Sequence, residues 1–208
     1  MILEARVGAI TASDGSVNSL RMGRTGELIT NDAGFGRYSE AVLRGYVFFA
    51  STQAGIAITA LNATATGFIL SNTAGSGKYL VLLSVQVAQS SAAAAATSQL
   101  SLAANVNTVA AAVVHTTPLT VRPALLGGSQ SAVGLADSSA TLPAAPVAIR
   151  VLHAPSVSAT ATTAIPPVLN FQIDGEVVLS PGTAVSLSNS AALSAWASMY
   201  WAEIPILS

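Results

Sequence analysis

Residues 78–87, with the sequence KYLVLLSVQV, follow a segment rich in glycine and small polar residues, NTAGSG at residues 72–77. A run of apolar and β-branched residues that begins after a turn-forming segment is typical of a β-strand. Every second side chain of a strand lies on the same face, so one face of this strand would carry Val81, Leu83, Val85 and Val87. The stretch therefore predicts a strand with one buried face.

Eight further segments have a strand-like composition and are separated by Pro, Gly, Asn and Ser. They are residues 45–50, 66–71, 99–105, 108–115, 146–153, 168–179, 184–188 and 195–204. The pair Asp174-Gly175 predicts a tight turn or a bulge within one of them, and the alanine run 92–96 is compatible with a short helix or a loop. Because no amphipathic helix lies between the strands, we expect an all-β fold, an antiparallel jelly-roll-like sandwich with an extended N-terminal arm.

The amino-acid composition indicates which partners such a fold could have. Charged residues make up 8% of the chain and hydrophobic residues 51%, whereas an average soluble domain is about 25% charged. A lone subunit would have too few charges to cover its surface, so we expect self-association into a homo-oligomer. The net charge of −1 argues against a nucleic-acid partner, and the polar residues within the apolar stretch 92–114 argue against a membrane span.

The charged residues are distributed unevenly, and ten of the seventeen lie within residues 1–44. This predicts an extended arm, residues 1–40, followed by a sandwich body, residues 41–208. Two interpretations of the arm are open, a segment that docks on another protein and a solvated terminus. If the arm docks, its charged hydrogen bonds would come from Arg6, Arg21, Arg24, Glu27, Arg37, Glu40 and Arg44.

The segment Gly75-Ser76-Gly77-Lys78 superficially matches the end of a phosphate-binding loop. The motif needs glycine where Asn72 stands and serine or threonine where Tyr79 stands, and it should open a helix. Here the segment precedes a predicted strand. We therefore interpret it as a hairpin loop.

The two histidines, His115 and His153, are the remaining candidates for catalysis. A metal site or a Ser/His/Asp triad would need one of them beside a carboxylate such as Asp137 or Asp174, and nothing in the local sequence requires this. The carboxylate Glu176 stands two residues from Asp174, but a glycine turn between them favours a solvated position. We expect no catalytic residue, no metal and no cofactor.

Aromatic residues are densest near the C-terminus, at Trp196, Tyr200 and Trp201. Tryptophan and tyrosine are enriched in cores and at interfaces between subunits, which is the interpretation that we favour here. The same residues could stack on a sugar ring if they were exposed along a groove. This leaves a carbohydrate-binding or host-recognition module as the alternative function.

Two groups of short motifs together carry a resemblance to a known class of protein. The first is RMGRTGEL at residues 21–28 with GRYSEA at 36–41, and the second is LSPG at 179–182 with WAEIP at 201–205. The chain resembles small structural proteins of tailed-bacteriophage virions, which have an N-terminal arm before a jelly-roll body. The resemblance implies a head-decorating, collar, tail or fibre component of the virion, commonly trimeric, attached to a capsid, portal or tail protein.

Overall fold

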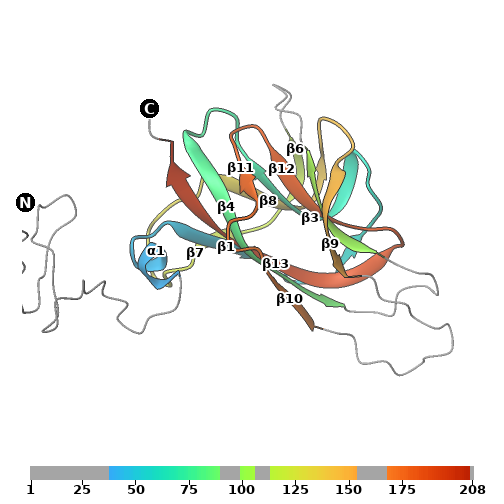
Figure 1. The fold of residues 1–208 in the computed structure, drawn as a ribbon, viewed down its shortest axis with the longest axis horizontal. Helices are drawn as coiled ribbons and strands as arrows, with labels where there is room; N and C mark the ends of the chain where they lie inside the picture. The colour runs from blue at the N-terminus through green and yellow to red at the C-terminus, as the bar shows by residue number, and fades with distance from the viewer. Residues whose placement is uncertain (1–37, 90–98, 106–112, 154–167, 207–208) are drawn as a thin grey trace, which may run out of the picture. The chain divides into compact units, whose positions relative to one another are not determined.

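A computed structural model of the chain describes residues 38–89, 99–105, 113–153 and 168–206. Within these residues it contains thirteen β-strands and one short helix, α1 (Ser39–Leu43) (Figure 1). The predicted arm, residues 1–40, lies outside the described residues except for residues 38–40. The alanine run 92–96 also lies outside them.

Seven strands form the first of two sheets. They are β1 (Val47–Ser51), β2 (Ile56–Ile58), β4 (Lys78–Gln89), β7 (Val121–Pro123), β10 (Val168–Gln172), β11 (Val178–Leu179) and β13 (Leu193–Pro205). Their order is β10-β4-β13-β1-β7, while β11 also pairs with β4 and β2 also pairs with β13. The long strands β4 and β13 therefore form the centre of this seven-stranded sheet.

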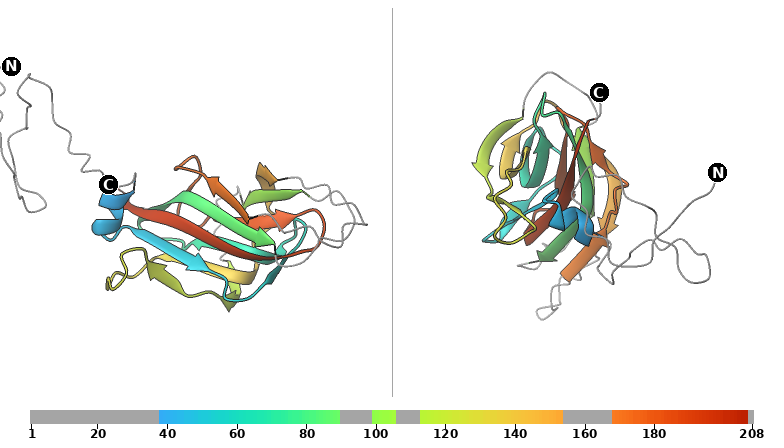
Figure 2. Two further views of the ribbon diagram at one scale, coloured as in Figure 1. Left: turned by 90° about the horizontal axis from the view of Figure 1, so that it is seen from below. Right: turned by 90° about the vertical axis from the view of Figure 1, so that its left-hand side faces the viewer.

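Six strands form the second sheet. They are β3 (Thr64–Asn72), β5 (Leu100–Asn105), β6 (Val114–Pro118), β8 (Gly134–Thr141), β9 (Val147–His153) and β12 (Ala184–Asn189). Their order is β6-β8-β3-β12-β5-β9. Every strand pair in both sheets is antiparallel, and the two sheets pack face to face (Figure 2). The expectation of an all-β, jelly-roll-like sandwich is confirmed.

The hydrophobic core lies between the sheets. Its largest fully buried side chains include Phe48 and Trp201 from the seven-stranded sheet and Phe68, Leu102 and Leu187 from the six-stranded sheet. Each full burial of such a side chain stabilises the fold by about 1.5–3 kcal/mol relative to exposure. The alternation of buried and less buried residues along β13 is nearly regular over its thirteen residues, so one of its faces points into the core.

A β-bulge corrects the predicted face of β4. Tyr200 of β13 stands opposite Ser84 and Trp201 stands opposite Leu82, so Leu83 is an extra residue in β4. The bulge reverses the alternation: Leu80 and Leu82 face the core before it, and Val85 and Val87 face the core after it. The prediction that Val81, Leu83, Val85 and Val87 share one face was therefore wrong for Val81 and Leu83.

The connection at residues 73–77 also differs from its prediction. It is a turn followed by a strand, as expected, but β3 and β4 belong to different sheets, so it is no hairpin. Gly75 and Gly77 adopt φ angles of +74° and +69°, which side chains of L-residues disfavour. The segment carries the chain from one layer of the sandwich to the other.

Three strands, β2, β7 and β8, have no counterpart in the sequence-based assignment. β6 begins at Val114, later than the predicted segment 108–115, of which residues 108–112 lie outside the described residues. Asp174-Gly175 forms a turn, in which both residues have positive φ and the amide of Glu176 donates to the carbonyl of Ile173 at 3.0 Å. Two consecutive positive φ angles define a type I′ turn, and this turn separates β10 from β11.

Candidate functional site

The outer face of the seven-stranded sheet points away from the core and is the surface with the most distinctive chemistry. Strand register assigns its side chains, because residues directly opposite each other on antiparallel strands lie on the same face. The bulge at Leu83 and the turn at Asp174-Gly175 divide this face into two regions. We call them the amide region and the apolar region.

The amide region consists of three registered rows across β10, β4 and β13. The rows are Val168, Ala88 and Trp196; Asn170, Gln86 and Ser198; and Gln172, Ser84 and Tyr200. Neighbouring strands lie about 4.8 Å apart, and successive rows about 7 Å apart. The rows therefore form a neutral grid of one tryptophan, three carboxamides and several hydroxyl groups.

Exposure and contacts show how these side chains are presented. Trp196 is 45% exposed, and Gln86, Asn170 and Gln172 are all exposed. The hydroxyl of Ser198 donates to Oε1 of Gln86 at 3.3 Å, which orients that carboxamide. Tyr200 stacks on Phe49 of β1, with ring centroids 5.2 Å apart and an interplanar angle of 17°.

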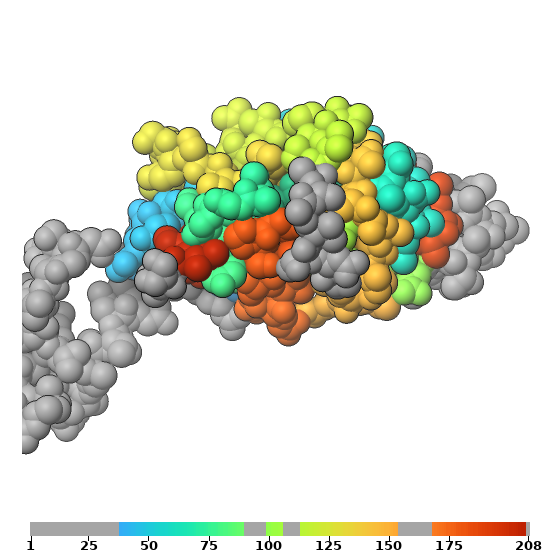
Figure 3. All heavy atoms as spheres, turned by 90° about the horizontal axis from the view of Figure 1, so that it is seen from above, coloured from blue at the N-terminus to red at the C-terminus, as the bar shows by residue number. Residues whose placement is uncertain are grey.

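The apolar region lies beyond the bulge, where β11 replaces β10 beside β4. Its rows are Val178, Val81 and Ala202, followed by Tyr79 and Ile204. Tyr79, Val178 and Ile204 are 39%, 51% and 47% exposed. The space-filling view shows the red end of β13, the green start of β4 and the orange residues around β11 together at the surface (Figure 3).

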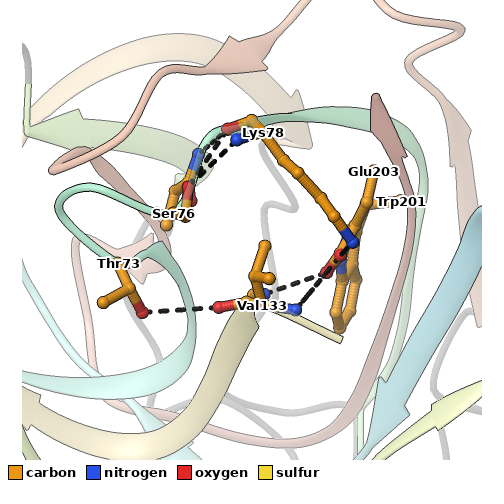
Figure 4. A network of polar contacts seen from close by, with 8 residues as sticks. Thr73, Ser76, Lys78, Val133, Trp201 and Glu203 are labelled. Atoms are coloured by element: carbon orange, nitrogen blue, oxygen red, sulfur yellow. Dashed lines mark hydrogen bonds and ion pairs between the residues drawn. The ribbon is translucent and has the colours of Figure 1, made fainter. Parts of the chain in front are cut away.

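A buried carboxylate lies on the core side of the strands that carry the apolar region. Oε1 of Glu203 accepts hydrogen bonds from the backbone amides of Val133 at 2.8 Å and Gly134 at 2.9 Å, and from the indole of Trp201 at 3.3 Å. Its Oε2 accepts from Nζ of Lys78 at 3.0 Å (Figure 4). Both oxygens are therefore engaged, and Glu203 joins β13 to the start of β8 across the two sheets.

This network is closely packed and structural. The hydroxyl of Thr73 donates to the carbonyl of Val133 at 3.3 Å, so the sheet-crossing turn is tied to the same backbone segment (Figure 4). A Cβ atom at Gly134 would lie 2.9 Å from the indole nitrogen of Trp201 and from a methyl group of Leu80. Oε1 of Glu203 accepts from three donors, and Oε2 accepts from Lys78 and, at 3.1 Å, from the amide of Val133, so the lone pairs of both oxygens are used within the protein.

Most of the residues predicted for docking lie outside the described residues: Arg6, Arg21, Arg24, Glu27 and Arg37. The other two, Glu40 and Arg44, stand on and just after α1 and form an exposed ion pair of 2.7 Å with each other. An exposed ion pair of this spacing contributes little to stability.

The three predicted aromatics do not form one group. Trp196 and Tyr200 lie on the outer face, whereas Trp201 is fully buried between the sheets, because residues 200 and 201 point to opposite faces of β13. Trp201 is therefore a core residue that donates to Glu203. Trp196 is the exposed tryptophan.

The structure brings His115 of β6 next to Asp137 of β8, a pairing that the local sequence did not require. Nδ1 of His115 lies 2.6 Å from Oδ2 of the fully buried Asp137, while Oδ1 of Asp137 has no hydrogen-bond partner within the described residues. A carboxylate in this position can hold an imidazole in one tautomer and orientation, as it does in catalytic triads.

A triad would also need a nucleophile that donates its proton to the imidazole. His115 lines a cavity of about 310 Å³ together with Ser71 and Thr73. These hydroxyls donate instead to backbone carbonyls, Ser71 to Leu135 at 3.4 Å and Thr73 to Val133 at 3.3 Å. In this arrangement neither hydroxyl is directed to His115.

The remaining candidates for chemistry are separate from this pair. His153 ends the edge strand β9, as expected, and Glu176 forms an ion pair with Arg150 of the same strand. Among the described residues no group of three or more His, Asp or Glu side chains is placed to hold a metal ion. The helix of the described part of the chain is too short and too polar to cross a membrane.

Sequence reasoning missed the carboxamides of the amide region. Gln86, Asn170 and Gln172 come from two strands more than eighty positions apart in the sequence, and only the strand register makes them neighbours of Trp196. The sequence could have separated the three aromatics, because alternate residues of a strand lie on opposite faces. Residues 196 and 200 therefore share one face, and residue 201 lies on the other. Comparison of the chain with known protein families, with curated proteins and with solved structures finds no match.

Proposed function

We propose that this chain is a non-enzymatic structural subunit that forms a homo-oligomer through the apolar region, and that the oligomer is a component of a tailed-bacteriophage virion. The observation that carries the proposal is the apolar region itself. Its five side chains come from three adjacent strands, include no charged group, and leave Tyr79, Val178 and Ile204 exposed.

The charge balance of the surface supports burial of this region against another protein. The described residues contain nine charged side chains, but Asp137 and Glu203 are fully buried and cover no surface. In contrast, fifteen large hydrophobic side chains of the described residues are exposed. Three of them, Tyr79, Val178 and Ile204, lie together in the apolar region. Contiguous apolar surface marks interfaces on soluble proteins, and removing it from water favours association by about 25 cal/mol per Å².

A second copy of the chain is the occupant that fits this chemistry. An uncharged apolar patch offers neither direction nor charge complementarity to a foreign partner, whereas identical patches can face each other around a symmetry axis. The trimeric state and the virion are implied by the resemblance of the terminal motifs to phage structural proteins. The arm, with its nine charged residues in 40 positions, would then select the attachment point.

The His115–Asp137 pair is the main argument for an enzyme, and its surroundings favour a structural interpretation. The pair joins the edge strand β6 to β8, and the hydroxyls that share its cavity donate to backbone carbonyls. A histidine and a carboxylate without an activated nucleophile lack the geometry of acyl transfer. This supports the proposal of a subunit without catalytic function.

The oligomeric state of the full chain tests the proposed interface. We expect light scattering at micromolar concentration to give an oligomer, and Ile204→Lys combined with Tyr79→Lys to give a folded monomer, because two ammonium groups would have to be buried in the interface. The matched control is Leu126→Lys, which introduces a charge at the most exposed large hydrophobic residue among those described, outside any of their strands. A monodisperse wild-type monomer would contradict the proposal.

Particle incorporation tests the proposed location and the role of the arm. We expect a chain that lacks residues 1–36 to fold and oligomerise like the full chain but to be absent from purified particles. The control is full-length Leu126→Lys, which should be incorporated. Normal incorporation of the truncated chain would show that the arm is only a solvated terminus.

A further inference from the structure

We infer that the amide region is a binding site for a neutral oligosaccharide, with Trp196 as the stacking platform. This inference does not depend on the proposed assembly, because the site uses different rows of the outer face. It assigns a ligand class to side chains that lie outside the proposed interface between subunits. The argument depends on their chemistry, spacing and charge.

The first step is the position of Trp196. Its side chain is 45% exposed although it stands on the central strand β13, with Ala88 opposite it on β4. The neighbouring side chain in the row is only a methyl group, which is consistent with the large exposed fraction of Trp196. An indole presents a flat face that attracts the polarised C–H groups of a sugar ring and excludes water from them.

The second step is the polar row beside the tryptophan. Ser198, Gln86 and Asn170 stand in register in the next row, about 7 Å along the strands, and Gln172 follows in the row after it. A carboxamide has two donor hydrogens and an acceptor oxygen, which matches the mixed donor and acceptor character of sugar hydroxyls. The bond from Ser198 to Gln86 at 3.3 Å holds one of these carboxamides in place before a ligand arrives.

The third step is charge. None of the nine side chains in these rows is charged; the flanking charged residues are Asp174, in the turn two residues after Gln172, and Arg122 on β7, beyond Tyr200 and Phe49. An acidic saccharide, a phosphate or a nucleic acid would find no cation within the rows. The site therefore fits a neutral sugar chain that lies across the strands.

The fourth step separates this site from a surface that a second copy would cover. Burying Gln86, Asn170 and Gln172 in a protein interface would require a hydrogen-bond partner for each carboxamide, because a buried amide without a partner loses its hydration free energy with nothing to replace it. Apolar contacts between like subunits need no such matching. The apolar region is thus the better interface, and the amide region is the better ligand site.

The chain has two tryptophans, which makes binding measurable without a label. The full-length protein would be titrated with cellohexaose, chitohexaose, maltohexaose and, as the acidic comparison, hexagalacturonate. Because Trp201 is fully buried, a ligand should alter the emission of Trp196 and protect it from quenching by acrylamide. We expect a saturable change with at least one neutral hexasaccharide at or below millimolar concentration and none with the acidic one.

Variants locate the site. Trp196→Ala should weaken binding by at least about tenfold in calorimetry, the range for loss of a central aromatic contact, and Trp196→Phe should retain part of the affinity. Asn170→Ala and Gln86→Ala should each weaken it several-fold. The control is Leu126→Ala, an exposed hydrophobic residue outside both regions, which should bind like the wild type.

Four results would overturn the inference. The first is a wild-type protein that binds none of the neutral sugars at millimolar concentration. The second is binding that Trp196→Ala leaves unchanged. The third is a Trp196→Ala variant that becomes monomeric while the wild type is oligomeric, which would identify the amide region as the interface between copies. An acidic sugar that binds more tightly than the neutral ones would overturn the assignment of ligand class.

Discussion

The amide region and the apolar region are two halves of one sheet face, built on the same two central strands, and yet they have different chemistry. β13 runs through both without interruption, whereas the outer strand beside β4 changes from β10 to β11 at the turn Asp174-Gly175. The carbonyl of Leu83, the bulged residue, accepts from the amides of Ile173 and Asp174 at 2.8 and 2.9 Å. The bulge and the turn therefore mark one shared boundary.

The two regions also differ in the residues on the core side of the sheet beneath them. Under the amide region the core side of β4 and β13 is apolar, with Val85, Val87, Ala197 and Met199. Under the apolar region the core side carries Glu203, with its hydrogen bonds to the β8 segment. The apolar region therefore lies over a buried polar network, whereas the amide region lies over apolar packing and a buried hydrogen bond from the amide of Ala197 to the hydroxyl of Thr52 at 3.0 Å.

The largest expected effect comes from breaking that network. Glu203→Ala would leave the amides of Val133 and Gly134 and the indole of Trp201 without an acceptor, and would leave Lys78 without its partner. We expect the free energy of unfolding, measured by urea titration, to fall by about 3–5 kcal/mol. Glu176→Ala, which removes an exposed carboxylate, should have little effect. Equal effects of the two variants would contradict a structural role for Glu203.

A smaller effect is expected from crowding the same network. Gly134→Ala would place a Cβ atom 2.9 Å from both Trp201 and Leu80, so one of these side chains would have to shift. Overpacking of this kind costs about 1–3 kcal/mol. Because Gly134 also donates to Glu203, the double variant with Glu203→Ala should lose less stability than the sum of the single variants. Simple additivity in urea titrations would show that the two residues are independent.

Placing carboxamides in the apolar region would test whether its apolar side chains hold the oligomer together, with little change in the stability of the subunit. Val81→Gln with Val178→Gln places two carboxamides side by side in the apolar region, since these residues stand opposite each other. We expect the dissociation constant of the oligomer, measured by sedimentation equilibrium, to rise by at least about tenfold. The free energy of unfolding of the subunit should change by less than about 0.5 kcal/mol at these surface positions. The reverse exchange, Gln86→Val with Asn170→Val, should leave the oligomer intact.

The smallest effect is expected at the histidines. His115→Gln with His153→Gln should leave folding, assembly and particle infectivity nearly unchanged, because a glutamine amide can still donate to Asp137. Thermal unfolding, light scattering and infectivity assays would measure the three properties. Loss of infectivity with normal folding and assembly would indicate a catalytic or metal-binding role for the pair, and would contradict the proposal of a subunit without catalytic function.

Local patterns predicted many of the strands but not all of them. β1, β9 and β13 carry several β-branched or aromatic residues and were recognised, as were β12 and the turn at Asp174-Gly175. β8 (Gly134–Thr141) was missed because glycine, alanine, aspartate and serine dominate it, and these residues have low β-propensity. This strand is stabilised by its pairing with β3 and β6, which no local pattern encodes.

The candidate sites also combine features that local sequence predicts with features that only strand pairing sets. The sequence by itself determined that the chain is all-β, poor in charged residues and rich in hydrophobic residues. These properties depend on composition and on the period of two along each strand. Only the tertiary structure decided that Trp196 stands with carboxamides, that Trp201 is buried on Glu203, and that His115 meets Asp137. Register between distant strands and a single bulged residue set these neighbours, and both depend on the packing of the whole sandwich.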